Sequence, residues 1–94
     1  MHVRVVRFTD VDPDRLEKLV GEINEAEGPP EGMPMHGLQM MLDRDQRTAV
    51  VIQTFDSEDD MRTSEQVLDA MDASETPGMR STVDRGELKL ELHA

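Results

Sequence analysis

The 94-residue sequence contains no cysteine, no tryptophan and no tyrosine, and each absence excludes a class of chemistry. Without cysteine the chain forms no disulfide, no iron–sulfur cluster and no thiolate metal site, and it has no cysteine nucleophile. Phe8 and Phe55 are the only aromatic residues, too few for the stacking platform of an RNA-recognition domain. No apolar run is long enough to cross a bilayer.

Positive charge is also scarce in this sequence. Ten lysine and arginine residues stand against 21 acidic residues, which gives a formal net charge of -11 at pH 7. Such a field repels nucleic acid and anionic membrane surfaces, so we expect neither as a partner. Residues 1–8 lack the apolar core of a signal peptide, and we therefore expect a cytoplasmic protein.

Apolar blocks alternate with polar turns in a pattern that predicts four strands and two helices. The predicted strands fall at residues 2–8, 35–42, 48–55 and 86–92. The blocks 2–8 and 48–55 are rich in β-branched residues, and 86–92 alternates strictly. Each helix follows a typical N-cap residue, Asp12 for the first and Ser57 for the second, and the first helix ends before Gly28. The order β-α-β-β-α-β predicts a single α+β domain over residues 1–94, ferredoxin-like, with two helices on one face of an antiparallel sheet.

Both faces of the predicted sheet are apolar. On the strand 48–55, Val50 and Ile52 point to one face, while Ala49, Val51 and Phe55 point to the other. Two helices can cover only one of these faces. A second copy of the chain is the simplest cover for the other, so the sequence predicts a homodimer whose sheets pack into an α/β barrel.

A chain of this length and element order, with two apolar sheet faces, resembles the antibiotic-biosynthesis-monooxygenase (ABM) domains of the dimeric α/β-barrel superfamily. The most specific stretch is 51–60, VIQTFDSEDD, which is similar to the third strand and the capped second helix of that family. The segment 35–39, MHGLQ, is similar to the glycine-bearing entry into its second strand. The resemblance implies a cofactor-independent monooxygenase that acts on a small organic molecule in a pocket between the helices and the sheet.

Two positions depart from the pattern of the active members that this sequence resembles. Phe55 stands where an active relative carries Trp, and Ser64 stands where many relatives carry an inward-facing His. The Asn, His and Trp set of the haem-degrading relatives has no counterpart in the sequence. A non-catalytic dimeric module, which binds a ligand or another protein after losing the site, therefore stays open beside the enzyme.

His36 is the candidate catalytic residue. It alternates with Leu38 and Met40 on one strand face, and an imidazole can act as a general base near physiological pH. The alternative is a hydrogen-bonded histidine at the start of a strand. Met33 and Met35 lie close to it in sequence, but methionines commonly fill core gaps in a chain poor in aromatics. We therefore predict no metal site and no cofactor.

Gln53, Phe55 and Ser64 are the candidate ligand-binding residues. Gln53 and Ser64 are polar residues among apolar neighbours, and both can line the same pocket between the helices and the sheet. The alternative for Gln53 is a place at the dimer interface, and for Ser64 a hydrogen bond to its own helix backbone. Phe55 enters through the resemblance, as the aromatic residue that ends the third strand.

Overall fold

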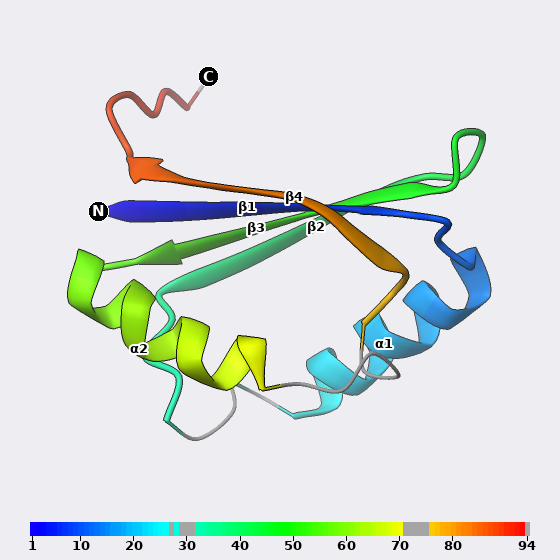
Figure 1. Ribbon diagram of the computed structural model, residues 1–94, viewed down its shortest axis with the longest axis horizontal. Helices are drawn as coiled ribbons and strands as arrows, with labels where there is room; N and C mark the ends of the chain where they lie inside the picture. The colour runs from blue at the N-terminus through cyan, green and yellow to red at the C-terminus, as the bar shows by residue number, and fades with distance from the viewer. Residues whose placement is uncertain (27, 29–31, 71–75, 94) are drawn as a thin grey trace.

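The computed structural model describes residues 1–26, 28, 32–70 and 76–93. Along the chain, its elements are β1 (His2–Thr9), α1 (Pro13–Glu25), β2 (Gly37–Asp43), β3 (Thr48–Phe55), α2 (Glu58–Asp69) and β4 (Met79–Glu87). The strands form one antiparallel sheet in the order β2-β3-β1-β4, and both helices lie on one side of it (Figure 1). This is the predicted ferredoxin-like α+β architecture. Neither α1 nor α2 is long and apolar enough to cross a membrane.

Both helices begin at the predicted caps, because side-chain oxygens accept hydrogen bonds from otherwise free backbone N–H groups. The N–H of Asp14 donates to Asp12 Oδ1 at 3.0 Å, and the N–H of Asp60 donates to Ser57 Oγ at 3.1 Å. The first turn of α2 carries three acidic residues, which suit the positive N-terminal end of the helix dipole. Local sequence therefore sets where each helix starts.

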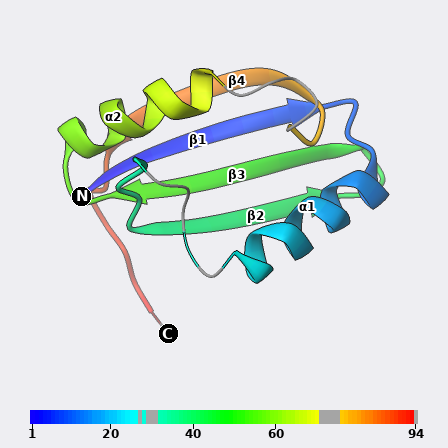
Figure 2. The same cartoon turned by 90° about the horizontal axis from the view of Figure 1, so that it is seen from below.

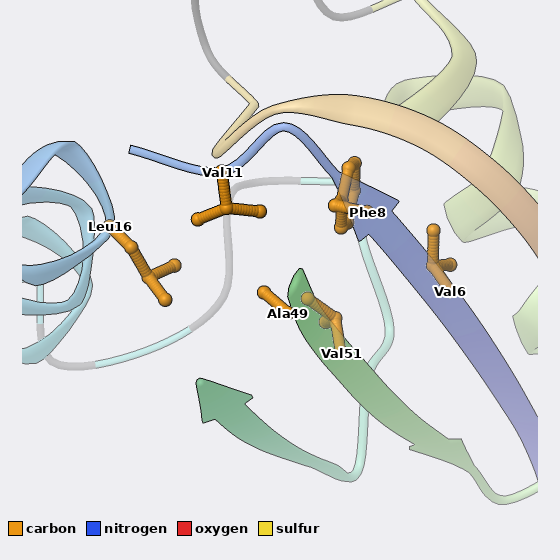
Figure 3. Packing of buried hydrophobic residues seen from close by; sticks show 6 residues of the cluster. All are labelled: Val6, Phe8, Val11, Leu16, Ala49 and Val51. Carbon is orange, nitrogen blue, oxygen red and sulfur yellow. The ribbon is translucent and has the colours of Figure 1, made fainter. Parts of the chain in front are cut away.

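The apolar core lies between the sheet and the helix layer. Alternate residues of β1 and β3 point toward the helices, and the register places Val6 beside Val51 and Phe8 beside Ala49, so same-face neighbours pack together. Leu16 of α1 and the loop residue Val11 close this part of the core. The cluster consists of Val6, Phe8, Val11, Leu16, Ala49 and Val51 (Figure 3).

The two central strands, β1 and β3, carry apolar residues on the opposite face of the sheet as well, as the sequence predicts for β3. Val5 and Ile52 are direct neighbours in the register of β1 and β3, and they point away from the buried residues next to them in sequence. On β2, Met41 lies on the same outer face and is 55% exposed. Within the described chain, no helix covers this face (Figure 1).

The prediction of the last strand is wrong. The sequence predicts a strand over 86–92, whereas β4 spans Met79–Glu87. β4 pairs only with β1, and its last residue lies opposite His2, the first residue of β1. The N–H of Leu88 still donates to the carbonyl of Met1 at 2.8 Å. The register of β1 and β4 ends at this pair, and the alternating residues that follow are not part of the strand.

The segment 88–93 therefore leaves the sheet with its leucines unpacked. Leu88, Leu90 and Leu92 are 37%, 73% and 83% exposed. The segment rises from the end of β4 on the side of the sheet opposite the helices (Figure 1). The apolar outer face and this apolar segment thus lie on the same side of the subunit.

Candidate functional site

A pocket of about 910 Å³ lies between the sheet and the two helices. β1, β2 and β3 form its floor, while α1 and the end of α2, which cover different parts of the sheet (Figure 2), form its walls. Its volume is typical of sites for small organic molecules. Most of the lining is apolar and includes four methionines, Met33, Met35, Met40 and Met79. Flexible methionine side chains adapt to ligands of different shape.

One charged side chain is buried in this largely apolar lining. The side chain of Arg4 is only 3% exposed, and its Nη1 donates a hydrogen bond to Gln53 Oε1 at 2.9 Å. Removing a guanidinium from water opposes folding by several kcal/mol, so this residue is a strong chemical signal. The sequence prediction omits Arg4, although its alternation with Val6 and Phe8 on β1 already places it on the helix-facing side.

Two carboxylates of α2 lie near Arg4, but other arginines hold them. Glu65 Oε2 is 3.9 Å from Arg4 Nε, and Asp69 Oδ1 is 3.9 Å from Arg4 Nη2. Arg85 donates two hydrogen bonds to Glu65, at 2.7 and 2.6 Å, and Arg80 donates one to Asp69 at 3.1 Å. Among the described residues, Arg4 Nε is buried without a hydrogen-bond partner. The carboxylates therefore compensate the charge of Arg4 from a distance at which no hydrogen bond forms.

Burial and these neighbouring groups shift the pKa values of Arg4 and Glu65. Burial lowers the pKa of the Arg4 guanidinium, against the nearby charges of Glu65 and Asp69, which raise it. The hydrogen bonds from Arg85 hold the pKa of Glu65 below its usual value, and the positive charges of Arg85 and Arg4 add to this effect. Arg4 and Arg85 are direct neighbours in the register of β1 and β4, where like charges repel. Glu65 relieves this repulsion, because it lies close to both guanidinium groups.

His36 lies at the rim of the pocket. Its backbone N–H donates to the carbonyl of Thr54 at 2.7 Å, and its Nδ1 is 3.2 Å from Asp56 Oδ1. A Cβ on the next residue, Gly37, would lie 2.8 Å from Thr54 Oγ1, so glycine permits this close entry into β2. The sequence predicts that His36 points into an enclosed space, but its side chain is 54% exposed. The structure thus places the imidazole on the lining and open to solvent.

The three candidate ligand-binding residues lie in different environments. Gln53 lines the pocket and is 5% exposed, which places it on the helix-facing side and away from the outer face. Phe55 and Ser64 are both 0% exposed and are not part of the pocket lining. Ser64 Oγ has no hydrogen-bond partner in the described part of the chain, so the predicted bond to its helix backbone is not formed. The structure brings Gln53 together with His36 and Arg4, but not with Phe55 or Ser64.

The fold defines a structural class. A β-α-β-β-α-β domain of this shape is the fold of ABM-like proteins. One solved structure with this fold is a substitution mutant of MhuD with two manganese protoporphyrin IX groups bound per active site. It aligns with a TM-score of 0.64 and 11% identity over 100% of both chains.

Two further solved structures are proposed antibiotic biosynthesis monooxygenases. The protein from Deinococcus radiodurans aligns with a TM-score of 0.59 and 14% identity over 100% of this chain and 98% of its own. The protein from Chloroflexus aurantiacus aligns with a TM-score of 0.59 and 8% identity over 99% and 96%. No protein-family model and no curated protein matches the sequence. At these identities the likeness establishes the fold.

Proposed function

We propose that this protein binds a mainly apolar organic molecule in the pocket between its helices and its sheet. The observation that supports this function is the pocket itself, with a volume of about 910 Å³ and a largely apolar lining. A few polar side chains, among them Arg4, Gln53 and His36, converge on this lining. That combination is typical of small-molecule sites, in which apolar walls supply affinity and a few polar groups fix orientation.

A neutral fluorescent probe, N-phenylnaphthylamine, tests this binding function. We expect saturable binding to the wild type, with fluorescence that rises as the dye leaves water. Leu19→Trp should weaken binding by roughly tenfold, because Leu19 lines the pocket and a larger side chain fills it. Lys18→Trp is the matched control, since Lys18 is exposed on the same helix and should leave the affinity unchanged. Equal affinities in the two variants would place the probe elsewhere.

The pair formed by His36 and Asp56 favours a second candidate, a cofactor-independent monooxygenase. An acidic partner 3.2 Å from Nδ1 orients the imidazole, as a general base requires. The base would remove a proton from an activated methylene group of the substrate, and the resulting carbanion would pass electrons to oxygen. In the net reaction, CH₂ + O₂ → C=O + H₂O, all the electrons come from the substrate and one oxygen molecule accepts them. The reaction therefore needs no cofactor.

Oxygen uptake with anthrone, which would yield anthraquinone, tests the second candidate. His36→Ala should lower the turnover by about 10²-fold, the usual effect of losing a general base, while Ser64→Ala should lower it much less. His93→Ala is the control, because His93 lies in the exposed segment that follows β4. Undiminished uptake by His36→Ala would remove the catalytic role from His36. A wild type that binds the probe but consumes no oxygen with anthrone or with quinol-like substrates would favour the ligand-binding module.

The proposed functional unit is a homodimer. The outer sheet face, with Val5 and Ile52 at its centre, and the exposed leucines of residues 88–92 lie on the same side of the subunit (Figure 1). A second copy would cover both, because the same apolar surface would face itself across a two-fold axis. Burying about 600 Å² or more from each subunit would reach the size of specific protein interfaces.

The proposed compartment is the cytoplasm. Residues 2–9 form β1, which pairs with both β3 and β4, so this segment contributes to the sheet. The chain contains no cysteine, so its stability does not depend on the disulfides that an oxidising compartment would preserve.

A further inference from the structure

We propose that the ligand of this pocket is an amphipathic organic acid. Its carboxylate would bind the pair formed by Arg4 and Gln53, and its apolar body would lie along the methionine-rich lining. This inference rests on the proposed binding function and adds the chemical class of the ligand to it. Three observations support the assignment: the free donors of Arg4, the orientation of Gln53, and the local balance of charge.

Arg4 presents more hydrogen-bond donors than the chain uses. A guanidinium carries five N–H donors, and within the described residues Arg4 forms a hydrogen bond only with Gln53 Oε1. The oxygens of Glu65 and Asp69 lie 3.9 Å away, and Nε is buried with no partner in the part of the chain that the structure describes. Since a buried donor without an acceptor is unfavourable, an oxygen-bearing ligand would complete this site.

Gln53 also directs donors at the site. Its side-chain oxygen accepts the hydrogen bond from Arg4, so its amide nitrogen, with two N–H donors, is the part of the group left for a ligand. No hydrogen bond from that nitrogen is formed within the described residues. The open groups of both side chains are therefore donors. A carboxylate, which only accepts hydrogen bonds and matches the planar fork of a guanidinium, is the complementary group.

The charge around Arg4 favours an anion over a cation. Arg4, Arg80 and Arg85 supply three positive charges, against the two carboxylates of Glu65 and Asp69. This cluster thus carries one excess positive charge, although the whole chain has a net charge of -11. Each carboxylate already accepts hydrogen bonds from an arginine of β4. A bound anion would therefore meet a guanidinium whose donors are not taken up by either carboxylate, and a cation would be repelled by the excess positive charge.

A matched pair of competitors tests the inference on the unmodified protein. Naphthoate and its amide, naphthamide, differ in charge but hardly in size, and each can displace N-phenylnaphthylamine at neutral pH. We expect naphthoate to bind roughly tenfold more tightly, the effect of a hydrogen-bonded charge. Equal affinities, or tighter binding of naphthamide, would overturn the organic-acid inference while the binding function stands. Failure of N-phenylnaphthylamine itself to bind would overturn the binding function instead.

Substitution of Arg4 tests whether this residue causes the preference for naphthoate over naphthamide. Arg4→Met should lower the affinity for naphthoate by roughly tenfold and change that for naphthamide little, because Glu65 and Asp69 keep their hydrogen bonds to β4. Arg62→Met is the control, since Arg62 is exposed on α2 and pairs with Glu58. The Arg62→Met variant should keep the preference for naphthoate over naphthamide.

The substitution Gln53→Glu provides a second variant if Arg4→Met does not fold. It would give Arg4 a carboxylate from the chain itself, and the preference for naphthoate should disappear. Retention of the preference in Arg4→Met or in Gln53→Glu would overturn the inference.

Discussion

The substitution Ile52→Asp should dissociate the homodimer and leave the subunit folded, whereas Val51→Asp should unfold the subunit. The two residues are adjacent on β3, so their side chains point to opposite faces of the sheet. Val51 is 7% exposed and belongs to the core cluster, while Ile52 lies beside Val5 on the outer face. An identical chemical change therefore tests the two faces separately.

The expected magnitudes follow from these positions. A two-fold axis places Ile52→Asp at the interface twice. The loss of about 2 kcal/mol of side-chain burial from each copy would weaken the dimer by about 4 kcal/mol, or roughly a thousandfold in dissociation constant. An aspartate at Val51 would leave an unpaired charge in the core, at a cost of about 3–5 kcal/mol. That loss is comparable to the whole stability of a small domain, which starts at about 5 kcal/mol.

Sedimentation velocity and circular dichroism together provide the assay. The wild type at micromolar concentration should sediment as a dimer and Ile52→Asp as a monomer, both with the same far-ultraviolet spectrum. Val51→Asp should lose that spectrum. Val51→Ala is the control, because it removes volume from the core without adding charge. A wild type that sediments as a monomer at every concentration would refute the homodimer, and a dimeric Ile52→Asp would show that this face is not the interface.

Two further predictions concern charge. The melting temperature should rise between low salt and about 0.5 M, where the Debye length falls to about 4 Å. The reason is that screening relieves the repulsion within a chain of net charge -11. A fall in melting temperature would contradict this prediction. The second concerns Glu65, whose pKa is held below its usual value chiefly by the hydrogen bonds from Arg85. The wild type should have a larger free energy of unfolding than Glu65→Gln. This difference should be complete above the pKa of an unfolded glutamate, about 4.3. It should shrink as the pH falls through the lowered pKa of Glu65 in the folded state. Urea unfolding across acidic buffers measures this difference, and a constant difference would count against the role of the ion pair.

Local signals predicted most of the fold. The caps at Asp12 and Ser57 depend only on hydrogen bonds within a few residues, and the alternation along β3 depends only on which side chains are apolar. Their predictions are confirmed because each rests on short-range chemistry. The strand predicted at 86–92 is wrong, although its alternation is strict. A strand also needs a partner backbone, and the pairing of β4 with β1 ends where Glu87 lies opposite His2.

The candidate site was predicted less well for a similar reason. Gln53 and His36 are on the pocket lining, whereas Phe55 and Ser64 are fully buried outside it. A buried side chain borders the pocket only where the helices leave the sheet uncovered. The alternation along one strand does not show where the helices lie. The sequence prediction omits Arg4 because charged residues are usually exposed. Its place among the helix-facing residues of β1 was nevertheless visible in the alternation.

The lining of the pocket also has an optical consequence. Its methionine and aliphatic side chains absorb almost no near-ultraviolet light, and Phe8 is the only aromatic residue among them. The whole chain adds no tryptophan or tyrosine, so the protein itself is nearly transparent in this range. A conjugated molecule retained from the host cell would therefore show its own absorption band, and the asymmetric pocket would give that band a circular dichroism signal. The near-ultraviolet spectrum of the freshly purified protein thus reports directly whether a conjugated molecule occupies the pocket.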